Sequence, residues 1–400
     1  MKWEKTTIGQ HCTVTSSKRF HLSDRSESGI PFYCSKEIIQ KVNGQVVSEC
    51  DYIKEEAYEQ VKEKFGVPQK GDLLITTRGT YGVPYVYKDD DRFYFADGNL
   101  TWLKDFDSSL CVDYLYYWIL SYEGQKKIDA IAKGTAQKAV PIALIKDIEI
   151  SIPDIKTQHR IASILSAYDD LIENNQKQIK LLEEAAQRLY KEWFVDLRFP
   201  GYENTPVVDG VPEGWRQGIL NDIVCNVGKA EKKENRIKYK YYLPIDCLPK
   251  QSLVYTNTND INLAESSLIS FSQSDILFGA MRPYFHKVVI ARDAGLTRST
   301  CFVLNAKISS LWSYMTMLLF SSDTIKYATK ISVGTTMPYV RWKDFAVMPI
   351  IIPNEEICIE FSKHILPITS KANNLAEQNI RLIQARDRLL PKLMNGELEV

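Results

Sequence analysis

The chain has 400 residues, of which 44% are hydrophobic and 25% are charged, a balance typical of a soluble globular protein. Fifty Lys and Arg residues are matched by fifty Asp and Glu residues, so the formal net charge is zero and a chain that is basic throughout is excluded. Any nucleic-acid surface must therefore be a local patch, offset by acidic residues elsewhere.

The predicted elements recur along the chain, with a second copy of the pattern about 200 residues after the first. Trp3 opens the first copy and Trp215 opens the second. The segments 70–87 and 272–290 each read as an apolar strand, a loop that carries Arg and Tyr, and a second strand. Further matches follow in the same order, which predicts an internal repeat.

Each copy ends with a Gly-Thr loop, a proline and a long helix. Pro153 is followed by Asp154 and Pro353 by Asn354, and both Asp and Asn commonly cap a helix N-terminus. The stretch 199–214, rich in Pro and Gly, reads as a linker. The predicted fold is α+β, with two tandem mixed, strand-rich domains and two long helices. The predicted segments are a first domain at 1–153, a first helix at 154–198, a linker at 199–214, a second domain at 215–353 and a second helix at 354–400.

The two long helices are predicted to pair as an antiparallel coiled coil. In each helix, residues at alternating spacings of three and four form an a/d seam, with Lys, Glu, Gln and Asn on the other faces. The seam residues are Tyr168, Leu171, Asn175, Leu182 and Leu189 in the first helix, and Leu375, Asn379, Leu382 and Leu389 in the second. The alternative is an ordinary helical hairpin packed into one core.

The length of these helices suggests a spacing role. Roughly 40 residues at ~1.5 Å each make a rod of about 60 Å. That length is on the order of one to two turns of B-DNA, at ~34–36 Å per turn. The helix pair is therefore interpreted as a ruler between the two domains.

The cysteines and the apolar runs bear on location. The eight cysteines are scattered and form no C-x-x-C pair, which favours reduced thiols over a disulfide framework or a zinc site. The N-terminus lacks the apolar region of a signal peptide, and no apolar run approaches the ~20 residues of a membrane span. We expect a cytoplasmic protein that does not associate with a membrane.

The sequence contains no recognisable catalytic constellation. It has no G-x-x-x-x-G-K-[ST] or G-x-G-x-x-G phosphate motif, and no adjacent prolines such as amino-methyltransferases use. The stretch 152–156 resembles half of a nuclease site, but Asp154 is better explained as a helix cap. The acidic run 88–92 reads as a hairpin turn, and the five histidines are dispersed, so no metal site is predicted. The chain reads as a binding protein without catalytic residues.

Three kinds of segment could contact nucleic acid, and each occurs in both copies. Basic segments would neutralise phosphates, and contribute Lys18 and Arg19 in the first copy and Lys229, Lys232, Lys233 and Arg236 in the second. Loops that carry arginine, which often reads guanine, contribute Arg78, Thr80 and Tyr81, then Arg282, Tyr284, His286 and Lys287. The Gly-Thr loops contribute Lys133, Thr135, Gln137 and Lys138, then Thr335 and Thr336. Because these loops differ between the copies, two unlike half-sites are predicted.

Three stretches carry a family resemblance: "IPDIKTQHRIASIL" at 152–165, "LYKEWFVDLRFPGYE" at 189–203 and "RLLPKLMNGELE" at 388–399. With these stretches, and over essentially its whole length, the chain resembles the specificity subunit of type I restriction–modification systems. The second copy departs from the Gln-x-x-Ile-Ala pattern that the first keeps at Gln158, Ile161 and Ala162.

The resemblance implies tandem target-recognition domains that read a bipartite, asymmetric DNA sequence with a non-specific spacer. It implies that the chain itself is not catalytic and holds no cofactor. Its partners would be double-stranded DNA, modification subunits that methylate adenine N6 with S-adenosylmethionine, and restriction subunits that cleave with ATP and Mg. Two rival interpretations are an enzyme with a degenerate nuclease or methyltransferase site, and a scaffold that carries two sugar- or protein-binding domains on a helical rod.

Overall fold

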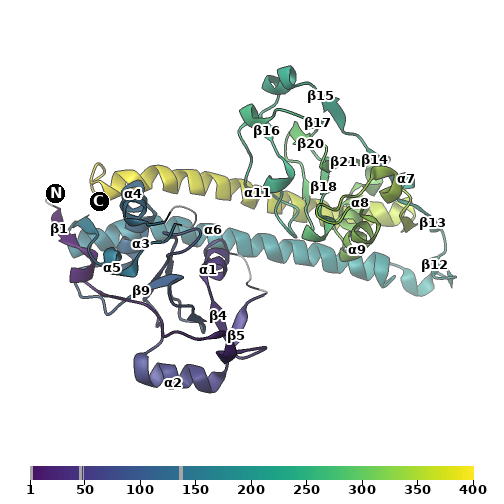
Figure 1. Cartoon of the computed structure of the whole chain (residues 1–400). Helices are drawn as coiled ribbons and strands as arrows, with labels where there is room; N and C mark the ends of the chain where they lie inside the picture. The colour runs from purple at the N-terminus through teal and green to yellow at the C-terminus, as the bar shows by residue number, and fades with distance from the viewer. Residues whose placement is uncertain (1–2, 45–46, 48, 135–137) are drawn as a thin grey trace. The chain divides into compact units, whose positions relative to one another are not determined.

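The computed structural model describes residues 3–44, 47, 49–134 and 138–400 (Figure 1). The chain divides into two compact units. Unit 1 comprises Met1–Glu173 and Leu382–Val400, and unit 2 comprises Asn174–Arg381. Each unit holds one strand-rich domain and a segment of both long helices, so the α+β fold class expected from the sequence is confirmed. The finer domain boundaries stay a prediction.

The domain of unit 1 contains a two-stranded ladder and two four-stranded sheets. The ladder pairs β1 (Glu4–Thr7) with β10 (Glu149–Ile152), antiparallel. The main sheet has the order β2 (Thr13–Thr15), β9 (Leu100–Lys104), β6 (Leu73–Thr76), β7 (Pro84–Val86). The side sheet has the order β3 (Arg25–Ser26), β5 (Asp51–Ile53), β4 (Ile30–Tyr33), β8 (Tyr94–Phe95).

Strand β6 is buried throughout because both of its faces are covered. Side chains alternate between the two faces of a strand. Leu73 and Ile75 enter a core formed with α3 (Val112–Leu120) and α4 (Tyr122–Ile131), whereas Leu74 enters a second core shared with α1 (Ser35–Val42). The remaining helices of this domain are α2 (Glu55–Phe65) and the short α5 (Ile142–Ile145).

Unit 2 repeats this plan. Its ladder pairs β13 (Arg216–Ile219) with β22 (Pro349–Ile352), directly after Trp215, as β1 follows Trp3. The main sheet has the order β14 (Val224–Asn226), β21 (Cys301–Ala306), β18 (Ile276–Gly279), β19 (Val288–Ile290). The side sheet has the order β15 (Lys229–Glu231), β17 (Leu268–Phe271), β20 (Gly295–Arg298), β16 (Tyr241–Tyr242). The helices are α7 (Leu220–Ile223), α8 (Trp312–Leu319), α9 (Ser322–Ile331) and α10 (Trp342–Phe345). A hairpin of β11 (Val207–Val208) and β12 (Val211–Pro212) precedes them in the linker.

The two domains agree in their main sheets and differ in their side sheets. Ser121 caps the N-terminus of α4 and Ser321 that of α9, and each serine hydroxyl accepts a hydrogen bond from the backbone N–H three residues later. In the side sheet of unit 1 the third strand in chain order, β5, is followed across the sheet by β4 and then β8. In unit 2 the third strand in chain order, β17, is followed by β20 and then β16. The second and fourth strands in chain order have therefore exchanged places between the two side sheets. The repeat is therefore exact in its framework and divergent in its side sheet.

The two long helices are α6 (Ile155–Tyr190), which continues in a π-helical turn (Lys191–Val195), and α11 (Glu355–Met394). Within unit 1, Arg386 of α11 reaches Asp169 of α6, at an Nη1–Oδ1 distance of 2.6 Å. Within unit 2, Asn175 bonds Asn379 at one end of the pair, and the Trp193 and Phe361 rings lie 5.5 Å apart at the other. The helices therefore run antiparallel within unit 2, as the sequence predicted.

One part of the predicted seam is wrong. Leu171 is 51% exposed, whereas its neighbour Ile172 is 8% exposed and faces inward. Further along α6, Ile179 and Ala186 are buried one residue after the positions that the predicted spacing selected. Both candidates at 171 and 172 are apolar, so the pattern alone could not choose between them. The remaining seam residues are buried or half-buried, namely Tyr168, Asn175, Leu182, Leu189, Leu375, Asn379, Leu382 and Leu389.

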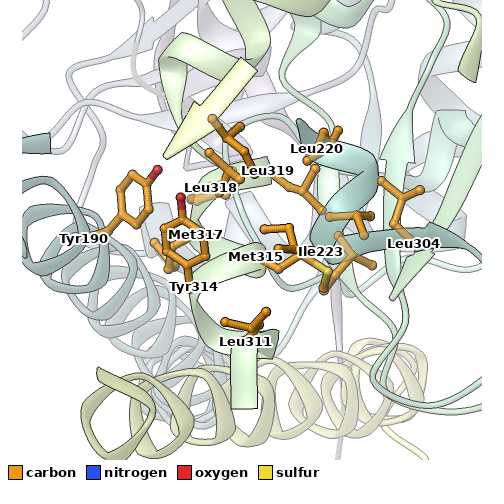
Figure 2. Packing of buried hydrophobic residues seen from close by; sticks show 14 of the residues in the cluster. Tyr190, Leu220, Ile223, Leu304, Leu311, Tyr314, Met315, Met317, Leu318 and Leu319 are labelled. Carbon is orange, nitrogen blue, oxygen red and sulfur yellow. The ribbon is translucent and has the colours of Figure 1, made fainter. Parts of the chain in front are cut away.

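The ends of the helices enter the domain cores. In unit 1, Leu165 near the start of α6 and Leu393 at the end of α11 pack in one cluster with Tyr114 of α3. In unit 2, Figure 2 shows Tyr190, from the end of α6, beside Tyr314 of α8, and their rings lie 6.1 Å apart. Burial of each such side chain contributes roughly 1.5–3 kcal/mol. The aromatic run at the end of α6 is thus core packing.

Gln158 has a structural role that explains one of the motifs. Its side chain is fully buried, accepts the backbone N–H of Cys111 at 2.9 Å, and donates to the carbonyl oxygens of Ser109 and Pro153 at 2.9 Å each. These bonds tie the start of α6 to the loop before α3, since a buried amide needs partners. In the second copy Cys358 is buried at the equivalent place.

Two further properties follow from the described residues. Within that part of the chain, no helix combines the length and apolar character needed to cross a membrane. All eight cysteines carry free thiols.

Candidate nucleic-acid interface

In unit 1 the basic segment and the Arg-bearing loop meet at the turn between β8 and β9. Arg19 pairs with Asp97 of this turn, at an Nε–Oδ2 distance of 2.9 Å. On the other side, Thr77 donates its hydroxyl to the carbonyl of Gly98 at 3.1 Å and its N–H to the carbonyl of Asn99 at 2.8 Å. The turn therefore joins two segments that lie far apart in the sequence.

The Gly-Thr loop of unit 1 joins the same surface. Arg78 and Lys133 each form a β-bridge with Ala139, and both side chains are exposed. Lys138 lies 3.2 Å from a carboxylate oxygen of Asp129, which also accepts the Tyr81 hydroxyl. The hydrogen bond from Tyr81, followed by that from Lys138, lowers the pKa of Asp129. Three of the predicted segments thus form one continuous polar surface.

The predicted residues of this surface differ in how far their side chains are exposed to solvent. Lys18, Arg19 and Thr80 are exposed at the surface of the domain. Tyr81 is half-buried and is held by Asp129. Thr135 and Gln137 of the Gly-Thr loop lie outside the described residues.

In unit 2 the Arg-bearing loop rests on the Gly-Thr loop. Arg282 donates its N–H to the carbonyl of Pro338 at 2.7 Å and its Nη2 to the carbonyl of Thr336 at 3.2 Å. It does so from a left-handed backbone conformation, with φ of 50°, which a non-glycine residue adopts at a cost. Thr335, Thr336 and Tyr284 are exposed beside it.

The predicted match between Arg78 and Arg282 is displaced by one residue. Arg78 bridges Ala139, and the residue that bridges the equivalent Tyr339 is Met281. Arg282 therefore occupies the place of Gly79, one residue further along the loop. The sequence comparison had matched the two arginines by residue type, because the two loops differ in sequence and offer no other guide to position.

Two residues predicted to contact nucleic acid have other roles in this loop. His286 is 8% exposed, and its Nε2 lies 3.0 Å from the carbonyl oxygen of Phe320. Lys287 is half-buried and donates its Nζ to the carbonyl of Ile245 at 2.7 Å. Burial lowers the pKa of both side chains. Both residues anchor the loop to its domain, so neither is retained as a direct contact.

The basic stretch of unit 2 is shaped by two glutamates. Glu231 accepts hydrogen bonds from Asn235 at 2.6 Å and from the Tyr239 hydroxyl at 2.9 Å, and the bond from Asn235 is the largest cause that lowers its pKa. Glu265 pairs with Lys233 at 3.0 Å. These contacts fold the stretch into the edge of the side sheet and a 3-10 helix (Lys233–Lys238). Lys229 and Lys232 are exposed, and Arg236 is half-buried.

The sequence missed one cation that the structure places between these segments. Arg298 ends β20 in an exposed position, and the turn after it carries Thr300, whose carbonyl accepts the N–H of Ala280 at 2.9 Å. The turn therefore lies next to the Arg282 loop, just as the turn that contains Asp97 and Asn99 lies next to the Arg78 loop. The equivalence of Arg298 to Asp97 depends on these turn hydrogen bonds, so the sequence alone offers no signal for Arg298.

Each domain is also tied to the long helices through polar side chains that are buried or half-buried. In unit 2, Glu183 of α6 accepts the Ser252 hydroxyl at 2.8 Å and the N–H of Leu253 at 2.7 Å. Burial raises the pKa of Glu183 to about 7. In unit 1, Asp169 of α6 accepts the Tyr117 hydroxyl of α3 at 2.6 Å as well as the guanidinium of Arg386.

The acidic run at 88–92 has a structural role. Asp91 accepts the Tyr85 hydroxyl at 2.6 Å and the N–H of Lys88 at 2.8 Å, and it lies 2.6 Å from the Lys41 amine. These contacts hold a turn, but the predicted hairpin is wrong, because the flanking strands β7 and β8 belong to different sheets and do not pair with each other. Among the residues that the structure describes, no three His, Cys, Asp or Glu side chains gather into a group that could hold a metal ion.

Comparisons with known proteins agree with this architecture. Residues 1–184 match the family model described as the type I restriction modification DNA specificity domain. The type I restriction enzyme MjaIX specificity subunit of Methanocaldococcus jannaschii is 27% identical over 358 residues, which cover 83% of this chain and 78% of that protein. The HindI specificity subunit of Haemophilus influenzae is 23% identical, over 82% of this chain and 87% of that one.

A solved structure shares the fold. The type I restriction–modification S subunit from M. genitalium superimposes with a TM-score of 0.60 at 18% identity, and the match covers 98% of this chain and 96% of that one. The resemblance that the sequence motifs indicated is therefore confirmed. Residues 1–184 match the family's DNA specificity domain, and the chain is related to the type I restriction–modification specificity subunits along most of its length.

Proposed function

We propose that this chain is the DNA-recognition subunit of a type I restriction–modification complex, in which each domain reads one half of a bipartite target. The observation that carries this proposal is the recurrence of one surface in both domains. In each, an Arg-bearing loop lies against a Gly-Thr loop and against the turn between the last side-sheet strand and the main sheet. Exposed Lys, Arg and Thr side chains on it suit phosphates and base edges.

The two domains are proposed to recognise different half-sites. Their frameworks match, but their side sheets differ in strand order and their loops differ in sequence. Arg78 stands where unit 2 has Met281, and Lys133 where unit 2 has Val333. Because base readout depends on a few side chains in fixed positions, such exchanges change the sequence that is read.

The long helices are proposed to set the spacing between the half-sites and to provide a surface on which methylase subunits dock. Helix α6 has 36 residues and α11 has 40. At ~1.5 Å per residue these lengths are about 54 and 60 Å. The hydrogen-bonded Asn175–Asn379 pair supports a fixed register, since a buried polar pair in a helix seam favours one alignment over others.

Catalysis is assigned to partner subunits in this proposal. Modification subunits would methylate adenine N6 with S-adenosylmethionine, and restriction subunits would cleave with ATP and Mg. The polar side chains of the candidate surface support recognition, because they are loop cations, hydroxyls and backbone groups rather than a nucleophile–base pair. A cytoplasmic location belongs to the same proposal.

Binding of the purified chain to double-stranded DNA tests this assignment. We expect retention that weakens steeply as salt rises from about 50 to 200 mM, because phosphate contacts release counterions. The chain alone should neither methylate nor cleave that DNA. Retention that does not change with salt would point to the scaffold interpretation, and turnover by the chain alone would point to an enzyme.

A further inference from the structure

The turns that join the side sheet to the main sheet can be aligned residue by residue between the two domains. In unit 1, the carbonyl of Asn99 accepts the N–H of Thr77 at 2.8 Å. In unit 2, the carbonyl of Thr300 accepts the N–H of Ala280 at 2.9 Å. The strands that follow, β9 and β21, begin at the next residue in both domains. Counting back from these carbonyls places Arg298 at the position of Asp97.

The charge at this position is therefore reversed between the two domains. Asp97 holds the guanidinium of Arg19 at 2.9 Å, and its side chain is 26% exposed. An acidic group at this place neutralises one of the cations on the unit 1 surface. The Arg19 side chain is 67% exposed, so this ion pair orients the guanidinium more than it stabilises the fold.

Arg298 has no such acidic counterpart at its own turn among the described residues. Its backbone pairs with Leu268 of β17, and its side chain donates a hydrogen bond of 3.5 Å from Nη2 to the Ser266 hydroxyl, at the upper limit for such a bond. The neighbouring carboxylate, Glu265, pairs with Lys233, and its pKa is lowered first by Lys233 and also by Arg236. The guanidinium is thus exposed and weakly held in a basic neighbourhood.

The turn also has a defined place on the candidate surface. On one side, the segment at Glu265 and Ser266 connects Arg298 to the basic stretch through Lys233. On the other side, the carbonyl of Thr300 contacts Ala280, two residues before Arg282. Arg298 therefore lies between the two segments of unit 2 that are proposed to contact DNA.

We infer that Arg298 contacts DNA in the half-site read by the second domain, at the place where the first domain presents the Arg19–Asp97 pair. This inference rests on the proposed function and adds a specificity-determining residue to it. An arginine guanidinium offers a planar fork of donors that suits a guanine edge or a phosphate. The first domain cannot make the same contact, because a carboxylate occupies the position.

The test compares maps of methylated adenines in host strains that carry the wild-type chain, Arg298→Ala or Arg298→Asp in the assembled complex. Arg298→Asp places the residue of the first domain at this turn. We expect Arg298→Ala to relax or weaken recognition in one half of the bipartite motif, with affinity for duplexes that carry the motif reduced by ~5–150-fold, as for the loss of one good arginine contact. Arg298→Asp should reduce it further.

Arg292→Ala is the matched control, since Arg292 lies in the same domain with its guanidinium 4.3 Å from the centre of the Tyr255 ring. It should leave both halves of the motif unchanged, and the melting temperatures of the Arg298 variants should match that of the wild type. An unaltered motif and affinity in Arg298→Ala, or equal effects on both halves, would overturn the inference. If the wild-type chain supports no bipartite motif, the proposed function itself fails.

Discussion

Asn175 and Asn379, 204 positions apart in the chain, form a buried hydrogen bond of 2.9 Å from Nδ2 to Oδ1. Their side chains are 7% and 1% exposed, and both lie among apolar neighbours of the α6–α11 pair in unit 2. A polar pair in such a place contributes less to stability than to the choice of one alignment. The two copies of the repeat thus meet through matching amides.

Replacement of one partner should destabilise the chain. Asn379→Leu leaves the Asn175 amide buried without this acceptor, which costs ~1–3 kcal/mol. Urea unfolding measures the change, with exposed Asn174→Leu as the control. The double variant Asn175→Leu/Asn379→Leu should recover most of the loss, because it removes both polar groups together. A single variant as stable as the wild type would show that the hydrogen bond has no energetic role.

Glu183 predicts a defined pH dependence. Its pKa in the folded chain is about 7, above the ordinary value of 4.5, because the carboxyl is buried. A raised pKa in the folded state means that the folded state binds the proton more tightly than the unfolded state. The contribution of Glu183 therefore favours folding at low pH, is lost as pH rises from about 4.5 to 7, and stays lost above that.

Glu183→Gln should remove this dependence. The amide oxygen can still accept from Ser252 and Leu253, and it does not ionise. At pH 8 the variant should be more stable than the wild type by up to about 3 kcal/mol, and near pH 4.5 the difference should vanish. Thermal unfolding against pH measures it, with Glu184→Gln as the control. A constant difference across this range would contradict a titrating Glu183.

Arg386 should matter for the attachment of α11 within unit 1. Its guanidinium bonds Asp169, which also accepts the Tyr117 hydroxyl. Arg386→Met keeps the length of the side chain but removes these bonds, at a cost of ~1–3 kcal/mol. The exposed Arg388→Met, on the same turn of α11, should change the unfolding free energy by less than about 0.5 kcal/mol. Equal effects of the two substitutions would rule out a specific role for the Asp169 contact.

The arginine loops should act on one half-site each. Arg78→Ala should weaken or relax recognition of the half-site read by the first domain, and Arg282→Ala that of the other. Arg282 also supports its own loop through Thr336, so its melting temperature must be checked alongside DNA affinity. Competition between duplexes altered in one half at a time gives the readout. Loss at both halves from either variant would contradict two independent readers.

The ruler can be shortened in a matched way. Residues 176–182 of α6 lie opposite 372–378 of α11, next to the Asn175–Asn379 pair, because the helices are antiparallel there. Removal of both heptads preserves the pairing and shortens it by ~10 Å. The preferred spacer should become shorter, by about three base pairs at ~3.4 Å each, while both half-sites stay the same. An unchanged spacer in a folded variant would refute the ruler.

The sequence predicted the framework well for a physical reason. Core strands such as β6 need apolar side chains on both faces, and helix caps need Ser, Asp or Asn, so the repeat leaves strong traces in both copies. The antiparallel helix pair followed from the same repeat. These features depend on local periodicity, which a single sequence contains.

The finer placement was beyond the sequence where neighbours compete or loops diverge. Leu171 and Ile172 are both apolar, and only packing selected Ile172. His286 was predicted to contact DNA from the surface, but in the fold its ring faces the carbonyl of Phe320. Arg298 was missed because its importance comes from its equivalence to Asp97. That equivalence becomes visible only when the turns of the two folded domains are aligned through their hydrogen bonds.

A genome-wide map of methylated adenines in the host, with and without this chain, tests the central claim most directly. We expect a motif of two unlike short halves with a fixed gap, methylated in the presence of the chain and unmethylated in its absence. If the modification subunits are expressed and no adenine methylation depends on the chain, the chain is not the recognition subunit proposed here.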